Sequence, residues 1–133
     1  LTGGKANDTH MSPTLLDGVT REMRLWREES FGPVKAIIRV HSEEEALAVA
    51  NDSEYGLSAA VYSRDSARAW NVAQRLHTGI CHINGPTVHD EAQMPFGGCK
   101  ASGYGRFGGR AGIAEFTELR WITIQTQPRE LPF

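Results

Sequence analysis

Four polar residues that follow a predicted strand are the first candidates for contact with a ligand. They are His82, His89, Asp90 and Glu91. Histidine and carboxylate side chains bind metals, but an adjacent Asp-Glu pair with one preceding histidine has no recognised ligand spacing. Loops at the carboxyl end of a parallel sheet are where ligands bind in α/β proteins. We therefore expect a polar, ligand-facing loop here, with His82 half-buried, and no metal site.

Nucleophilic catalysis is the second candidate chemistry, because the chain has two cysteines, Cys81 and Cys99. Cys81 falls inside a predicted strand, where cysteine usually acts as a small buried apolar residue. Cys99 precedes Lys100, a charge that favours a thiolate, but no histidine is adjacent to it in sequence. Both cysteines are interpreted as structural, and no complete catalytic set is found.

Six glycines lie within residues 97–109, and the run GYGRFG at 103–108 has the spacing of a dinucleotide-binding fingerprint. That fingerprint requires an apolar strand directly before it and an acidic residue ending a second strand about 20 residues later. Residues 97–102 do not read as a strand, and the next predicted strand supplies no acidic residue. We interpret the glycines as permitting unusual backbone angles and close packing instead.

The elements that position these residues are predicted in the middle of the chain. Short β-rich runs occur at 36–40, 57–62 and 80–83, and two helical segments alternate with them. Strand, helix, strand, helix, strand with short connections is typical of a parallel sheet with right-handed crossovers. The predicted fold class is therefore α/β, with a parallel βαβαβ sheet, and residues 1–33 are expected to be irregular.

Both helices carry start signals. Ser42 precedes three glutamates and stands three residues before Glu45, which is capping-box spacing. Asp65 can cap the second helix, and Gly79 is expected to end it. The buried stripe of that second helix is predicted to consist of Ala69, Val72, Ala73 and Leu76. A further short helix is expected over residues 109–116.

Residues 120–127 form the last predicted strand. Trp121, Thr123 and Gln125 alternate with Ile122, Ile124 and Thr126, which suits a sheet with two unlike faces. The strand follows a long glycine-rich excursion, so we do not expect it to join the first sheet. An unpaired strand needs a partner edge, and another subunit can supply one.

The length and composition of the chain limit its fold class, its partners and its location. The chain has 133 residues, of which 40% are hydrophobic and 23% charged, typical of one globular domain that buries its own core. A net charge of −2 gives little support for binding nucleic acid or an anionic membrane. No run approaches a spanning helix, and two cysteines are too few for a disulfide scaffold, so a cytoplasmic location is expected. The first residue is Leu1, which fits a removed tag or signal, or a piece of a longer chain.

A fourth motif, EESFGPV at residues 28–34, is informative only in combination with other motifs along the chain. Alone it indicates an acidic loop with one aromatic ring, able to hydrogen-bond a diol and to lie against a planar ring. Further motifs follow in order at 51–57, at 95–103 (PFGGCKASG) and at 116–118 (FTE). Over essentially the whole chain, this series resembles the C-terminal portion of the NAD(P)-dependent aldehyde dehydrogenase family. Residues 80–96 and the ending RWITIQ are most similar to its branch in bacterial aromatic catabolism, acting on salicylaldehyde and next on vanillin.

The resemblance implies roles for individual residues. Glu29 would hydrogen-bond the nicotinamide ribose, and Phe31 would pack near the nicotinamide. Phe96 would form an aromatic wall of the substrate tunnel, with His89 and Asp90 in the loop at the tunnel mouth. We expect Glu29, Phe31 and Phe96 to form one wall of a shared pocket.

The resemblance also implies an assembly. Arg106 and Glu118 match residues that tie cofactor and catalytic regions together at a dimer interface. Residues 120–127, with Trp121, match the C-terminal strand of the family's oligomerisation sheet. Residues 1–118 would then be the C-terminal part of a catalytic domain and residues 119–133 an oligomerisation strand and tail, in a homodimer or homotetramer.

In the family's reaction, a cysteine thiolate attacks the aldehyde, hydride passes to NAD or, as the alternative, to NADP, and water hydrolyses the thioester. The family's nucleophilic cysteine, general-base glutamate and cofactor domain have no counterpart here, and neither Cys81 nor Cys99 aligns with the nucleophile. The resemblance therefore implies roughly the last third of an enzyme that oxidises an aromatic aldehyde, inactive by itself. The alternative is a non-catalytic oligomerisation or interaction module that keeps the family's dimer-forming surface.

Overall fold

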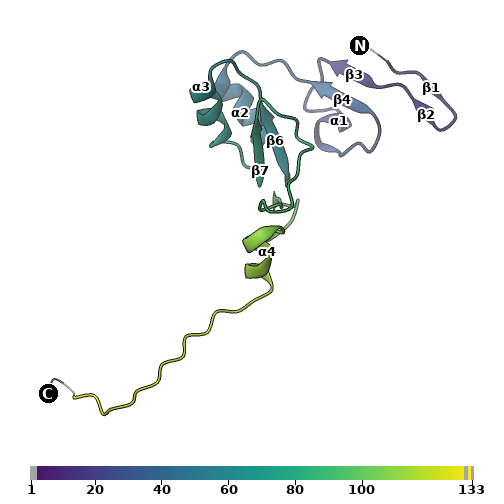
Figure 1. Cartoon of the computed structure of the whole chain (residues 1–133). Helices are drawn as coiled ribbons and strands as arrows, with labels where there is room; N and C mark the ends of the chain where they lie inside the picture. The colour runs from purple at the N-terminus through teal and green to yellow at the C-terminus, as the bar shows by residue number, and fades with distance from the viewer. Residues whose placement is uncertain (1–2, 131, 133) are drawn as a thin grey trace.

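The computed structural model describes residues 3–130 and 132. The strands are β1 (Ala6–Asn7), β2 (His10–Met11), β3 (Thr14–Asp17), β4 (Val34–Ile37), β5 (Tyr55–Gly56), β6 (Ser58–Val61), β7 (Ile80–Ile83) and β8 (Cys99–Lys100). The helices are α1 (Arg24–Arg27), α2 (Glu43–Asn51), α3 (Ser66–Ala73) and α4 (Gly109–Glu115). Figure 1 shows a folded body that ends in α4, followed by an extended tail that leads away from it.

Two parallel strand pairs form the α/β part of the body. β3 runs beside β4, with Thr14 opposite Val34, and β6 runs beside β7, with Ala60 opposite His82. Helix α3 connects β6 to β7 and contacts both strands. The predicted α/β class and its parallel strands are therefore confirmed, with β6, α3 and β7 as one βαβ unit.

The strand pairing differs from the prediction of one three-stranded sheet. β4 pairs with β3 rather than with β6, so the described residues form two separate parallel pairs. β3 lies in the region predicted to be irregular, as do α1 and the antiparallel hairpin β1–β2. The prediction missed β3 because its four residues directly follow Pro13 and are too few for a clear alternation.

Both predicted helix caps are confirmed. The Ser42 hydroxyl accepts a hydrogen bond from the Glu45 N–H at 3.1 Å, and the Asp65 carboxylate accepts one from the Arg68 N–H at 3.0 Å. The Glu45 carboxylate reaches back to the N–H of His41 at 2.7 Å, one residue earlier than a standard capping box would place it. Side-chain oxygens thus satisfy N–H groups that the first turns of α2 and α3 leave free.

The prediction that Gly79 ends α3 is wrong. The helix ends at Ala73, and a turn separates it from Gly79. Gly79 instead donates its N–H to the carbonyl of Gly56 at 3.0 Å and leads directly into β7. Glycine at this position therefore allows another backbone segment to approach closely and does not end a helix.

The core is smaller than the composition predicts. Among the described residues, the buried apolar side chains are Val19, Leu47 and Ala69, and Thr14 is the buried polar one. The solvent-accessible surface is 11258 Å², whereas a compact protein of this mass exposes about 6,900 Å². The expectation of a self-sufficient core is therefore wrong, because much apolar surface stays open to contact.

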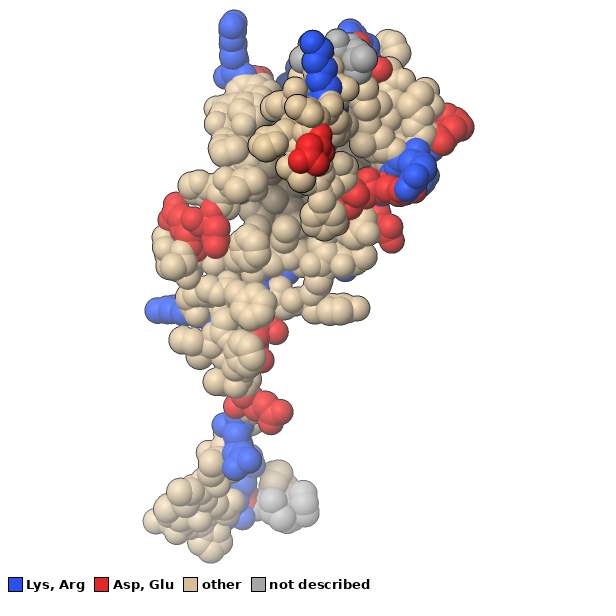
Figure 2. Space-filling view, turned by 90° about the vertical axis from the view of Figure 1, so that its right-hand side faces the viewer, with Lys and Arg blue, Asp and Glu red and all other residues tan. Residues whose placement is uncertain are grey.

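The predicted strand at 120–127 is not formed within the described chain. After α4 and the turn at Phe116, residues 117–130 run extended without a β-partner, and Figure 2 shows them as a narrow projection. The Trp121 side chain is 90% exposed. Pairing with another subunit stays a prediction, since a strand needs an edge that this part of the chain does not offer. No helix in the described part is long and apolar enough to cross a membrane.

Candidate active-site pocket

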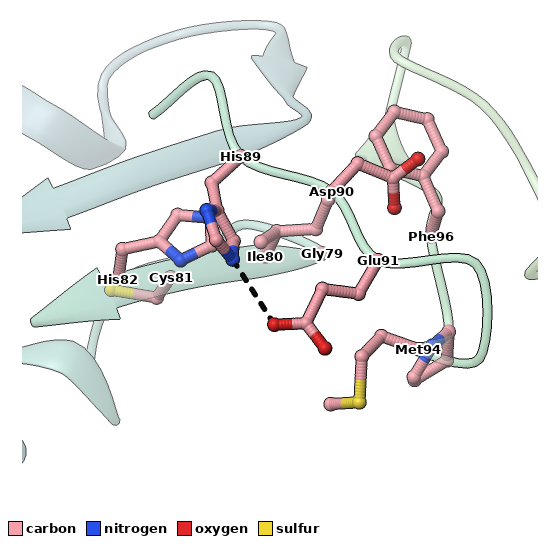
Figure 3. Close-up of a pocket in the computed structure, with 10 residues that line it drawn as sticks. Gly79, Ile80, Cys81, His82, His89, Asp90, Glu91, Met94 and Phe96 are labelled. Carbon is pink, nitrogen blue, oxygen red and sulfur yellow. Dashed lines mark hydrogen bonds and ion pairs between the residues drawn. The ribbon is translucent and has the colours of Figure 1, made fainter. Parts of the chain in front are cut away.

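A pocket of about 340 Å³ lies between β7 and the loop that follows it. One side is lined by β7 and the residue before it, with Gly79, Ile80, Cys81 and His82. The other side is lined by the loop, with His89, Asp90, Glu91, Met94, Pro95 and Phe96 (Figure 3). The structure thus brings together His89, Asp90 and Phe96, the three residues expected to contact substrate. Sequence reasoning had left Cys81 and Met94 out of this group.

The loop leaves β7 through a turn that is tied to β6. Asn84 adopts a left-handed backbone (φ 56°), which asparagine tolerates better than most residues. Its side chain accepts a hydrogen bond from the Ser63 N–H and donates one to the Ser63 carbonyl, at 2.9 and 3.0 Å. The Ser58 hydroxyl donates to the carbonyl of Thr87 at 2.9 Å. These bonds fix where the chain enters the pocket wall.

The glycine-rich segment holds the far end of the loop. Phe96 and Phe107 exchange two backbone hydrogen bonds, at 2.8 and 2.7 Å. Gly108 has φ of 88°, and a β-carbon there would collide with the carbonyl of Met94. The predicted use of glycine for unusual angles and close packing is confirmed at this position.

The polar side of the pocket is a chain of contacts around two histidines. The rings of His82 and His89 meet edge to face, with centroids 5.4 Å apart. His89 Nε2 lies 3.4 Å from a carboxylate oxygen of Glu91, while His82 Nε2 is buried and has no hydrogen-bond partner among the described residues. Within that same part of the chain, no group of three or more His, Cys, Asp or Glu is arranged to hold a metal ion.

Neither cysteine has the surroundings of an activated nucleophile. Burial raises the pKa of the Cys81 thiol, which reduces its thiolate fraction at neutral pH. The Cys99 thiol donates to the carbonyls of Gly56 and His77, at 3.4 and 3.2 Å, and so ties the β5–β8 pair to the turn before β7. These contacts support the structural interpretation of both residues.

Glu29 and Phe31 do not reach the pocket. They lie between α1 and β4, next to the first strand pair, whereas Phe96 lies beside the second. This pocket is lined by Phe96 and by neither Glu29 nor Phe31, so a wall shared by the three residues stays a prediction. Glu28 is engaged by Arg24, with N–O distances from 2.7 Å, whereas no hydrogen bond or ion pair of Glu29 occurs within the described residues. The Phe31 ring is 95% exposed.

The residues expected at an interface differ in their surroundings. Arg106 Nη1 donates to the carbonyls of Gly98 and Gly105, at 2.8 and 2.6 Å, so it braces its own glycine-rich segment. Glu118 is exposed, as is Trp121. Their predicted interface roles stay predictions. The carboxylate of Glu115 accepts a hydrogen bond from the Arg106 N–H at 3.3 Å, which places negative charge where the glycine fingerprint would need to receive phosphate.

A parallel α/β fragment with an aromatic-walled pocket alongside β7 is compatible with many enzymes, and comparison with known proteins identifies the family. The family model described as "Aldehyde dehydrogenase family" matches residues 1–122, so the chain belongs to the aldehyde dehydrogenase family. It is 64% identical over 132 residues to a vanillin dehydrogenase of Pseudomonas sp. (strain HR199 / DSM 7063), covering 99% of this chain and 27% of that protein.

Solved structures agree with this assignment. A salicylaldehyde dehydrogenase from Pseudomonas putida G7, complexed with salicylaldehyde, matches with a TM-score of 0.89 and 51% identity over 98% of this chain and 27% of that one. An aldehyde dehydrogenase from Mycobacterium tuberculosis, complexed with NAD⁺, matches with a TM-score of 0.80 and 38% identity over 87% of this chain and 25% of that one. The chain thus spans about a quarter of the length of these relatives.

Proposed function

We propose that this chain is a segment of an NAD-dependent enzyme that oxidises an aromatic aldehyde to its carboxylic acid. The observation that carries the proposal is the 64% identity to a vanillin dehydrogenase over nearly the whole chain. The identity to a salicylaldehyde dehydrogenase is 51%, so the preference for salicylaldehyde over vanillin that the sequence motifs favoured has less support. An aromatic aldehyde is the substrate class that both relatives have in common.

The pocket supports this substrate class. Phe96 and Met94 offer an apolar, polarisable surface for a planar ring, and His82 and His89 offer polar contacts opposite. The carboxylates of Asp90 and Glu91 line the same pocket and disfavour an aldehyde that carries its own negative charge. In this proposal the chain binds and orients the aldehyde, while the nucleophile and general base belong to polypeptide outside residues 1–133.

Two exposed residues are suited to hold the nicotinamide cofactor, which would accept hydride when bound. The carboxylate of Glu29 can accept paired hydrogen bonds from a ribose diol, because its neighbour Glu28 rather than Glu29 engages Arg24. The Phe31 ring is open to stack against a planar group. NAD is the proposed cofactor, with NADP as the alternative.

The proposed assembly is a homo-oligomer joined partly through residues 119–133. The extended tail, which has no β-partner within the described residues, and the large exposed surface support it, since both need a partner surface. The same features suit the alternative of a non-catalytic interaction module. A cytoplasmic location stays a prediction from the sequence.

A chimera tests the proposed function. Residues 1–133 replace the matching quarter of the Pseudomonas sp. vanillin dehydrogenase, and NADH formation is followed with benzaldehyde and its hydroxylated derivatives. We expect an active chimera and no turnover by the 133-residue chain alone. A folded chimera that binds its partner subunits but oxidises no aldehyde would favour the interaction module.

A further inference from the structure

The carboxylate of Asp52 contacts two arginines of the segment that leads to the proposed cofactor residues. Its oxygen Oδ2 lies 3.5 Å from Arg21 Nη1 and 3.6 Å from Arg27 Nη2. This oxygen is buried, and the two guanidinium groups supply the opposite charge that a buried carboxylate oxygen requires. Arg21 also lies over the Trp26 ring, 5.6 Å from its centroid. One carboxylate therefore contacts the chain before α1 and at the last residue of α1.

Few other polar contacts attach this segment, residues 20–32, to the part of the chain that follows it. Helix α1 buries none of its four residues, and the ion pair between Arg24 and Glu28 is internal to the segment. Among the described residues, no backbone hydrogen bond and no further ion pair joins residues 20–32 to the chain beyond residue 40. The position of the segment relative to α2 therefore depends on Asp52.

Asp52 has a well-anchored backbone. It follows the last residue of α2, and its N–H donates to the carbonyl of Ala48 at 3.0 Å. The side chain of the preceding Asn51 donates to the carbonyl of Arg75 at 2.9 Å and accepts from the His77 N–H at 2.8 Å. These bonds join the end of α2 to the turn before β7, so the carboxylate stands on a support that can hold an exposed segment in place.

The two residues proposed to hold the cofactor lie close to this anchor in sequence. Glu29 follows Arg27 by two residues and Phe31 follows it by four. Two extended residues span at most about 7 Å, so a displacement of Arg27 is passed on to Glu29. A binding segment that is already held in place loses less conformational freedom when its ligand binds, which strengthens binding.

We propose that Asp52 is a positioning residue for the nicotinamide cofactor. Through its ion pairs with Arg21 and Arg27, it holds the segment that presents Glu29 and Phe31. The inference rests on the proposed function and deepens it, because it names the residue that holds the proposed cofactor-binding segment in place. Asp52 itself touches neither the cofactor nor the aldehyde.

The test uses the chimera with Asp52→Asn, which keeps the size of the side chain but removes its charge, and with Asp52→Glu, which keeps the charge. Fluorescence titration gives the dissociation constant for NADH. Both arginines are more than half exposed, so each ion pair alone is weak, and we expect Asp52→Asn to raise this constant about fivefold and Asp52→Glu to raise it less. The KM for the aldehyde should not change.

Glu54→Gln is the matched control. It also removes one negative charge, two residues further along, and no ion pair of Glu54 occurs in the part of the chain that the structure describes. We expect this variant to bind NADH like the unchanged chimera.

Two further measurements separate positioning from a general loss of stability. Arg27→Gln should weaken NADH binding as well, and its combination with Asp52→Asn should weaken it little further, because the two residues act through one contact. Without cofactor, amide hydrogen exchange in residues 20–32 should be faster in Asp52→Asn than in Glu54→Gln.

The outcomes distinguish the inference from the proposed function. Equal NADH constants for Asp52→Asn and Glu54→Gln would overturn the inference, even if Asp52→Asn melts at a lower temperature. Unchanged exchange in residues 20–32, or independent effects of Asp52→Asn and Arg27→Gln, would overturn it too. If the chimera oxidises no aldehyde but its NADH binding depends on Asp52, the proposed function fails and the inference stands. A chimera that binds no NADH would overturn both.

Discussion

The carbonyl oxygen of Gly97 occupies the place where a β-carbon at position 79 would stand. The two glycines therefore meet backbone to backbone, one at the start of β7 and the other just after Phe96. Gly79 is further held by its hydrogen bond to the carbonyl of Gly56. This contact sets the distance between the two sides of the pocket, since each glycine adjoins a residue that lines it.

Replacing Gly79 should open the pocket. A Gly79→Ala substitution forces β7 and the segment at 97–98 apart, and we expect it to lower the free energy of unfolding of the chimera by about 1–3 kcal/mol. Guanidinium unfolding measures the change. Gly112→Ala is the control, because a β-carbon there meets nothing closer than 3.8 Å. If the Gly79→Ala and Gly112→Ala variants were equally stable, the close approach of the Gly97 backbone would not restrict the residue at position 79.

The Ser42 cap should contribute measurably to α2. Ser42→Ala removes the acceptor for the Glu45 N–H, and we expect a loss of about 1 kcal/mol in chimera stability. Ser66→Ala, at the first residue of α3 in an exposed position, is the comparison and should change stability much less. A Ser42→Gly variant should recover most of the loss, since glycine is tolerated at this position. Matching losses in Ser42→Ala and Ser66→Ala would contradict the cap.

How far the sequence predicts this molecule depends on how local each signal is. The caps at Ser42 and Asp65 were predictable because a side chain and an N–H three residues away decide them. The pairing of β3 with β4 was not, because it joins Thr14 to Val34 across twenty residues through a strand too short to show a pattern. The same holds for Gly79, whose neighbour Gly97 is distant in sequence.

The residues of the candidate site also differ in how local the sequence signals for their positions are. His89, Asp90 and Phe96 were predicted together and lie together, because one loop carries them. The position of Glu29 and Phe31 relative to them depends on how two strand pairs are arranged, and no local pattern encodes that. His82 was noted for its residue type, but the sequence could not show that its Nε2 atom is buried without a hydrogen-bond partner among the described residues.

The ion pair between Arg75 and Glu44 should make stability depend on pH. The Arg75 guanidinium, which donates to Glu44 Oε1 at 2.8 Å, holds the pKa of that carboxyl below its ordinary value of 4.5. A lowered folded-state pKa means that the stabilisation is complete above the unfolded value and disappears as pH falls through the folded one. We expect the melting temperatures of wild type and Glu44→Gln to differ modestly at pH 7 and to converge toward pH 3.

Salt provides the second readout for this pair. Both side chains are exposed, so 1 M NaCl should remove most of the difference between wild type and Glu44→Gln at pH 7. Glu54→Gln is the control, because no ion pair of Glu54 occurs within the described residues. A wild-type advantage that persists at pH 3 or in high salt would mean that Glu44 stabilises α2 by some other contact.

Substitution of Trp121 should show whether the extended tail pairs with the edge of a sheet in another subunit. Its side chain is 90% exposed, and those of Leu119 and Ile124 are exposed as well, so this extended apolar segment has no sheet partner within the described residues. Trp121→Asp places a charge where a paired strand would be covered, and we expect light scattering to show the chimera shifted from its oligomer to smaller species. Gln127→Asp adds the same charge at the end of the predicted strand and should preserve the oligomer. If Trp121→Asp assembles like wild type, residues 119–133 are not the oligomerisation segment, and the open surface of the body must carry the contact instead.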